Sequence, residues 1–129
     1  MKDISIKEKF KIRSGDFVFA FAGRIVNDKG ISELVKAFEA VSNDFPTRRL
    51  LLLLIGNFEE AHDPLTEDTV KYLTNNRRVI LAGFQFDITP WFAPADAFVF
   101  PSYREGFPNV VMQASLLQVP CIVTNINGC

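Results

Sequence analysis

The sequence predicts an α/β fold with a doubly wound parallel sheet. Short β-rich apolar runs alternate with segments of helical periodicity along the chain, which is the pattern of successive βα units. The run 50–55 is continuously apolar, as expected for a strand that helices cover on both faces. The chain has 129 residues, 48% of them hydrophobic and 22% charged, and shows no repeat or linker. These observations indicate a single folded domain.

The first half of the chain predicts a strand, a helix and a second strand. Residues 17–22 form a short aromatic and aliphatic run typical of a strand. Apolar residues then recur at helical spacing over 31–41, with Ser32 as the expected N-cap, and Asn43 to Pro46 closes this helix. The apolar run 50–55 follows, which predicts the buried central strand.

The second half continues the alternation. A more polar helix is expected from Pro64 and Thr66 to about Leu73. The remaining expected elements are strands over 79–82, 97–100 and 121–124, a short helix over 88–92, and a helix that follows Glu105.

Charge and cysteine content exclude several classes of protein. Fourteen basic and fifteen acidic residues give a net charge of −1, so no overall field favours nucleic acid as a partner. Two cysteines and one histidine do not have the spacing of a metal site, and we expect Cys121 to pack as a small apolar residue. Residues 1–16 lack the apolar core of a secretory signal, and the run 50–55 is too short to span a membrane. We therefore expect a cytoplasmic location with free thiols.

The segment from Ser102 to Ala114 predicts a ligand-binding loop that enters a helix. Pro108 suits the first helical position because it has no N–H, and Gly106 permits a close approach of the backbone to a ligand. The unpaired amides of such a helix start can face an anion. Glu105 and Gln113 lie eight positions apart, so we expect them to frame one crevice.

Two cations are expected at the same crevice. Arg24 follows Gly23 directly after the first strand, and Lys29 precedes the next helix. Ligands of open α/β sheets bind at the carboxyl ends of the strands, so both side chains can reach one diphosphate there. The alternative is that they are ordinary solvated loop charges.

The chain resembles the donor-binding domain of the retaining nucleotide-sugar glycosyltransferases of family 4, which have the GT-B fold. The resemblance rests on Phe21–Arg24, on Lys29-Gly30 followed by a helix, on Ala95–Ser102 and on Tyr103–Pro108, in the order and at the spacing of that family. It implies a Rossmann-like domain, one of two that enclose the active site. Residues 1–129 are then expected to be part of the C-terminal, nucleotide-sugar-binding domain, truncated at its C-terminus, with the acceptor-binding N-terminal domain absent.

The resemblance also implies roles for individual residues. Arg24 and Lys29 correspond to residues that contact the phosphates and stabilise the leaving nucleoside diphosphate, and Glu105 corresponds to the first glutamate of an E-x7-E motif beside the donor sugar. These three are the expected catalytic residues. The expected substrate-binding residues are Gly23, Gly83, Phe84, Gly106, Phe107, Pro108, Asn109 and Gln113.

The motif departs from the family at Gln113, which replaces the second glutamate. Glutamine keeps one acceptor oxygen and adds an NH₂ donor, so it can still bind ribose in a different arrangement. The alternative is that Gln113 is an ordinary residue on the helix surface with no part in ligand binding. We expect Phe84 to lie either beside the nucleobase or in the core. We expect Trp91 and Tyr103 to be packing residues.

The expected function is transfer of a sugar from a nucleoside-diphosphate-sugar donor to an acceptor hydroxyl with retention of configuration. The resemblance implies no metal, no cofactor, and a glycan or lipid-linked acceptor bound through the absent domain. It also implies a place in polysaccharide synthesis such as capsule formation, possible peripheral association with the inner face of the membrane, and little activity of this part alone. The alternative is an inactive nucleotide-binding or scaffolding relative. The chain contains neither G-x-G-x-x-G nor the P-loop pattern, and Gln113 removes a second carboxylate that a glycosidase would need.

Overall fold

The computed structural model describes residues 5–105 and 108–126. Its centre is one sheet of five parallel strands in the order β3-β2-β1-β4-β5. The strand bounds are β1 Phe17–Ala22, β2 Leu50–Ile55, β3 Val79–Gly83, β4 Ala97–Phe100 and β5 Cys121–Val123. All five predicted strands are present, and the parallel α/β fold expected from the sequence is confirmed.

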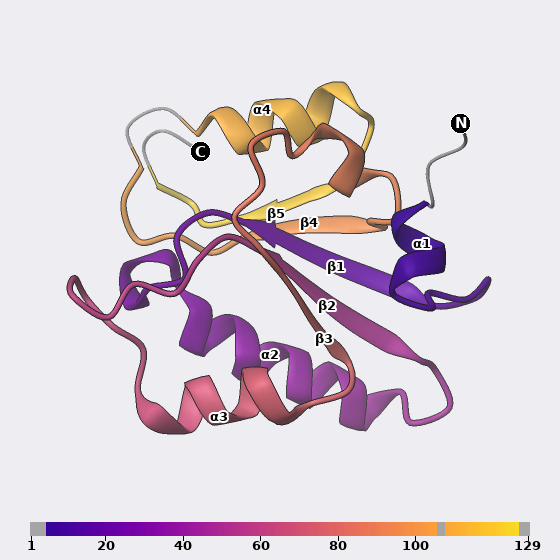
Figure 1. Cartoon of the computed structure of the whole chain (residues 1–129), viewed down its shortest axis with the longest axis horizontal. Coiled ribbons are helices and arrows are strands. Elements are labelled where there is room, and N and C mark those ends of the chain that lie inside the picture. The colour runs from indigo at the N-terminus through magenta and orange to yellow at the C-terminus, as the bar shows by residue number, and fades with distance from the viewer. Residues whose placement is uncertain (1–4, 106–107, 127–129) are drawn as a thin grey trace.

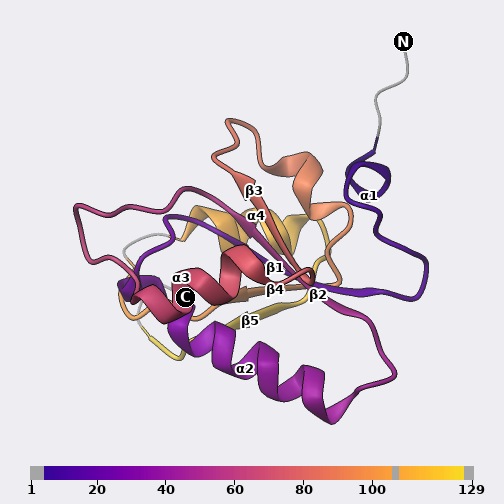
Figure 2. The ribbon, with the colours of Figure 1, turned by 60° about the horizontal axis from the view of Figure 1, so that its bottom comes forward.

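Helices cover both faces of the sheet. In Figure 1, α2 and α3 lie on one side and α4 on the other, and the turned view in Figure 2 shows the same layers. The helical bounds are α1 Ile6–Lys9, α2 Ile31–Asp44, α3 Glu67–Asn75 and α4 Asn109–Leu116, with 3-10 turns η1 Asn27–Lys29 and η2 Thr89–Phe92. Among the described residues, no helix is both long and apolar enough to cross the bilayer.

The core lies on both faces of β1 and β2. Every residue of β2 is buried, which explains why its sequence is apolar throughout rather than alternating. Aromatic residues fill much of the remaining space. Phe98 lies between Phe92 and Phe100, with ring centroids 5.5 and 5.9 Å away, and Phe100 stacks on Phe21 at 5.8 Å. Trp91 is buried, as expected from the sequence.

Two expected helix starts are wrong by one or two positions. Ser32 lies inside α2, whose N-cap is Gly30 in the left-handed conformation with φ of 75°. Pro108 is the N-cap of α4 rather than its first helical residue. For α2, the turn at Gly30 sets the start of the helix. The two short helical pieces α1 and η1 were not expected, because neither is long enough to show an apolar period.

The strand order places a topological switch point at β1. The chain builds β2 and β3 on one side of β1 and then returns to add β4 and β5 on the other. The loops that follow β1 and β4 therefore leave the sheet in opposite directions and open a crevice between them. In doubly wound sheets this crevice is where ligands bind.

Candidate functional site

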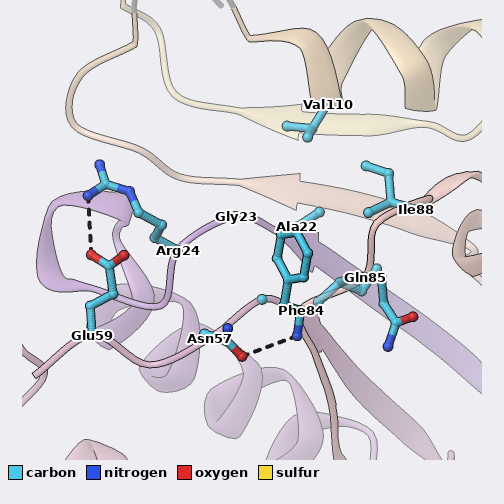
Figure 3. A pocket seen from close by; sticks show the side chains of 11 residues that line it. Ala22, Gly23, Arg24, Asn57, Glu59, Phe84, Gln85, Ile88 and Val110 are labelled. Carbon is cyan, nitrogen blue, oxygen red and sulfur yellow. Dashed lines mark hydrogen bonds and ion pairs between the residues drawn. The ribbon is translucent and has the colours of Figure 1, made fainter.

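Two adjoining cavities lie at the carboxyl ends of the strands. The first, of about 280 Å³, opens between the loops after β1 and β4. The second, of about 370 Å³, extends over the ends of β2 and β3 and is drawn in Figure 3. Both contain Ala22, Gly23, Arg24 and Val110, so they are continuous with one another. The site is thus an elongated crevice across the switch point.

A close backbone contact joins the two sides of the first cavity. A Cβ on Gly30 would lie 2.1 Å from the carbonyl oxygen of Pro101, so only glycine allows η1 to approach the end of β4 this closely. The amide of Tyr103 donates to the carbonyl of Asp28 over 2.9 Å and closes the same junction. This junction brings the loop carrying Lys29 beside the loop carrying Glu105.

Lys29 and Glu105 form an ion pair in the first cavity. The Lys29 ammonium contacts Oε2 of Glu105, and the two side chains are only 14% and 12% exposed. The ammonium also lies 5.8 Å from the centroid of the Phe100 ring. A second bond to Oε2 comes from the hydroxyl of Ser102 over 2.7 Å. The pair therefore joins two loops that are 76 positions apart in the sequence.

Arg24 has a different partner. Its Nη1 lies 3.3 Å from Oε2 of Glu59, which is on the loop after β2, and the Arg24 side chain is 59% exposed. Figure 3 shows this pair at one side of the second cavity. An anion that enters the crevice must compete with Glu59 for the guanidinium. Since an exposed ion pair contributes only about 0–1 kcal/mol, this competition is weak.

The second cavity combines apolar side chains with two amides. Asn57 accepts the backbone N–H of Phe84 through its Oδ1 over 3.2 Å, and the Gln85 side chain donates to the carbonyl of Ala82 over 2.9 Å. Ile88 and Val110 line the opposite wall. Phe84 is 68% exposed, so its alternative assignment to the core is wrong. Its ring is available at the cavity for a planar ligand.

Tyr103 is also not a packing residue, because its side chain is 58% exposed. Its hydroxyl donates to Oε2 of Glu33 on α2, and this hydrogen bond is the main reason why the pKa of Tyr103 is raised. Burial adds a smaller upward contribution to the pKa. The phenol therefore stays protonated at neutral pH and ties the loop after β4 to α2.

The start of α4 faces the first cavity. No side chain caps this helix, and Pro108, Asn109 and Val110 line the cavity. Within the described part of the chain, the backbone amides of Asn109 and Val110 donate to no other residue. An anion in the cavity can accept these hydrogen bonds.

The structure brings together most of the site residues expected from the sequence. Gly23, Arg24, Lys29, Glu105, Pro108 and Asn109 line the first cavity, and Phe84 lines the second. Gly83 and Gln113 line neither cavity, and Gln113 is partly buried on α4. Gly106 and Phe107 lie outside the described residues.

Sequence reasoning missed several residues that shape the crevice, namely Asn57, Glu59, Gln85, Ile88, Ser102 and Val110. Most of them lie on loops or at a helix start, where no periodicity marks them. The described residues contain no group of three or more histidine, cysteine, aspartate or glutamate side chains placed to bind a metal ion.

Known proteins match this chain over almost its whole length. The capsular polysaccharide biosynthesis glycosyltransferase CapM of Staphylococcus aureus is 38% identical over 125 residues, which cover 95% of this chain and 32% of CapM. The UDP-Gal:alpha-D-GlcNAc-diphosphoundecaprenol alpha-1,3-galactosyltransferase of Escherichia coli is 29% identical over 124 residues, covering 95% of this chain and 32% of that enzyme. The chain thus spans about a third of the length of these relatives.

Solved structures share the fold. The crystal structure of HepE from Anabaena, in complex with UDP and glucose, superimposes with a TM-score of 0.68 at 24% identity, over 88% of this chain and 31% of HepE. Residues 16–129 also match the family described as glycosyl transferases group 1. The chain therefore belongs to the group 1 glycosyltransferase family.

Proposed function

We propose that this chain is the donor-binding part of a retaining glycosyltransferase that moves a sugar from a nucleoside-diphosphate-sugar to an acceptor hydroxyl. The observation that carries the proposal is the convergence of Arg24, Lys29, Glu105 and the start of α4 on one crevice at the switch point of the sheet. Cations and the amides of a helix start suit a diphosphate, and a carboxylate suits a sugar.

The diphosphate occupies the first cavity in this proposal. In the ligand-free site each cation already has a carboxylate partner, Glu59 for Arg24 and Glu105 for Lys29. The exposed Arg24 can leave Glu59 for a phosphate, whereas the Lys29 ammonium has three hydrogens and can serve Glu105 and a phosphate together. Both cations and the α4 amides then stabilise the charge of the departing nucleoside diphosphate, so that no metal is needed.

The nucleobase occupies the second cavity, with its plane against Phe84. We propose uracil as the base, since the E. coli relative is named as using UDP-Gal and HepE was solved with UDP. The exposed Phe84 ring supports a stacking contact. The amides of Asn57 and Gln85 lie at the same cavity and supply polar groups for the base or ribose.

The sugar lies next to Glu105. Its carboxylate accepts hydrogen bonds from sugar hydroxyls and stabilises positive charge that develops at the anomeric carbon. The acceptor hydroxyl then attacks from the face that the nucleoside diphosphate leaves. The bond from the anomeric carbon to the phosphate oxygen breaks, the hydroxyl proton passes to the departing diphosphate, and the configuration is retained. We propose a glycan or lipid-linked acceptor at the cytoplasmic face of the membrane, in line with the capsular role in the name of the S. aureus relative.

Thermal unfolding with a ligand panel tests the proposal. The panel is millimolar UDP, GDP, ADP, UDP-glucose, UDP-galactose and NAD, each with and without EDTA. A ligand at a hundred times its dissociation constant stabilises a fold by about 2.7 kcal/mol, a shift of several degrees. We expect a shift with UDP and its sugars that EDTA does not alter. If NAD shifts the melting temperature and no nucleoside diphosphate does, the donor-site proposal is wrong.

Arg24→Ala is expected to weaken UDP binding by about 1.5 kcal/mol, roughly tenfold, because it removes a charge-assisted hydrogen bond to phosphate. Isothermal titration calorimetry measures this loss. The matched control is Arg104→Ala, since Arg104 is 84% exposed, pairs with Asp28 and lines neither cavity. Equal losses for the two variants would show that Arg24 acts only through the general charge of the surface.

Glu59→Gln is expected to have the opposite effect and tighten UDP binding by about 1.4- to fivefold. The change removes the carboxylate that competes with the diphosphate for Arg24, and an exposed pair contributes about 0.2–1 kcal/mol. Glu60→Gln is the control, because it removes the same charge from the neighbouring position outside both cavities. The gain should disappear in the Arg24→Ala background. A gain that persists there would contradict competition for Arg24.

Gln113 supports a second candidate, a relative that binds nucleotide without transferring sugar. Glutamine stands where the family motif has its second glutamate, and its side chain does not line the described crevice. Such a protein would bind UDP in the panel. The complete protein would then neither hydrolyse nor transfer the sugar of any UDP-sugar, and Gln113→Glu would be the variant to test for recovery.

A further inference from the structure

We infer that Ser102 is a positioning residue for the donor sugar. Its hydroxyl holds one carboxylate oxygen of Glu105 in place, so that the other oxygen is presented to the sugar. This inference rests on the proposed function of Glu105, and it adds a residue for which the family motif implied no role.

Ser102 is held firmly at the end of β4. It is fully buried, and it is the one polar residue that is buried as a whole among the residues that the structure describes. Its backbone carbonyl accepts a hydrogen bond from Oγ1 of Thr124 over 2.6 Å, which ties it to the segment after β5. The next residue, Tyr103, bonds to Asp28 of η1. Contacts from two neighbouring loops therefore fix the position of the hydroxyl.

The hydroxyl has one hydrogen and three possible acceptors. Oε2 of Glu105 lies 2.7 Å away, the carbonyl of Arg104 lies 3.0 Å away and the carbonyl of Asp28 lies 3.4 Å away. The carboxylate is both the nearest and the only charged acceptor. A hydrogen bond to an ionised acceptor is the strongest of the three, so the hydrogen points to Glu105.

The two bonds to Glu105 fall on the same oxygen. Lys29 and Ser102 both contact Oε2, while Oε1 accepts no hydrogen bond from any residue in the described part of the chain. The Lys29 ammonium is a point charge on a flexible stem, so its contact with Oε2 alone does not fix the orientation of the Glu105 carboxylate. The buried serine supplies the second fixed point, which determines the direction of Oε1.

This geometry explains why a polar side chain is buried here. A hydroxyl in the interior is costly unless it is hydrogen-bonded, and alanine would pack in nearly the same space without that requirement. The serine is useful if the carboxylate must hold one orientation. A sugar hydroxyl that binds Oε1 then meets an acceptor that is already oriented, which strengthens binding of the sugar and leaves binding of the nucleotide unchanged.

The first arm of the test needs no ligand. Thermal unfolding is measured for this chain, for Ser102→Ala, for Glu105→Ala and for the double variant. If the hydroxyl bonds the carboxylate, the double variant should lose less than the sum of the single losses, by about 3–5 °C. Additive losses would overturn the inference. This arm reports on the contact whether or not the chain binds a nucleotide.

The second arm compares UDP-glucose with UDP by calorimetry. Ser102→Ala should reduce the preference for UDP-glucose over UDP by about tenfold, as expected for the loss of one charge-assisted hydrogen bond, while the affinity for UDP stays within twofold. Ser102→Thr keeps the hydroxyl and should retain most of the preference. Ser115→Ala, which removes an exposed serine of α4, is the matched control.

The outcomes separate the inference from the proposed function. Non-additive losses of melting temperature together with a lost preference for UDP-glucose support the inference. Non-additive losses with an unchanged preference overturn it, because Ser102 would then have only a structural role. If the unaltered chain binds no nucleoside diphosphate of the panel, the proposed function fails, and the positioning role fails with it even if the first arm detects the contact.

Discussion

Replacing Gly30 by alanine is expected to destabilise the fold by about 3–5 kcal/mol, a large effect for a single substitution. Two costs add up. Gly30 has φ of 75°, and a left-handed conformation costs an L-residue about 1–2 kcal/mol. In addition, the new Cβ would lie 2.1 Å from the carbonyl oxygen of Pro101 and 2.9 Å from its carbonyl carbon. Neither backbone can yield without moving η1 away from the end of β4.

Urea unfolding of Gly30→Ala and Gly83→Ala separates these costs. Gly83 has nearly the same φ of 71°, but a Cβ there would meet no atom within 4 Å. Gly83→Ala should therefore show only the conformational cost of about 1–2 kcal/mol. Similar losses in the two variants would mean that the approach of Gly30 to Pro101 is not tight. A larger loss for Gly30 shows that the junction between the two loops is a requirement of the fold.

The sequence predicted the strands and the general position of the site, but it did not predict this junction between the two loops. The five strands were predicted because each is a short apolar run, and the full burial of β2 was predicted because all of its residues are apolar. The expectation that β2 is the central strand was wrong, since β1 lies at the middle of the sheet and β2 beside it. The placement of Arg24, Lys29 and Glu105 near the carboxyl ends of the strands also followed from the fold class. These predictions depend on local composition and on a general rule of topology.

The partners of the charges could not be predicted in the same way. Glu59 lies in a loop beside Glu60, and nothing in the sequence distinguishes the carboxylate that pairs with Arg24. The contact of Lys29 with Glu105 spans 76 positions and depends on the approach of Gly30 to Pro101. Ser102 belonged to a recognised motif, but its burial and its bond to Glu105 appear only when the loop is folded.

The N-cap of α2 gives a simpler example. Ser32 has the right side chain for a cap and lies near the first apolar residue, so the sequence favoured it. The structure uses the left-handed Gly30 instead, since η1 and α2 meet there at a sharp turn against Pro101. A tertiary contact therefore took precedence over a local preference.

Lys29→Met is expected to reduce the affinity for UDP by about 2–3 kcal/mol, roughly 30- to 150-fold, and to destabilise the fold by a further 1–3 kcal/mol or so. Methionine has an unbranched apolar side chain of similar length and removes the charge that faces the Phe100 ring. The Glu105 carboxylate, only 12% exposed, is then left with Ser102 as its partner and repels the incoming phosphates. Calorimetry measures the affinity, and urea unfolding measures the stability.

The double variant Lys29→Met with Glu105→Gln distinguishes the two effects. Neutralising Glu105 removes the unpaired charge, so stability should recover by about 1 kcal/mol or more, whereas UDP affinity should stay low because the phosphate-binding cation is still missing. Lys36→Met on the exposed side of α2 is the matched control and should change neither quantity. If Lys29→Met lowers stability but binds UDP as tightly as the unaltered chain, the ion pair is structural. The diphosphate would then have to be held by Arg24 and the start of α4, and Lys29 would have no part in stabilising the leaving group.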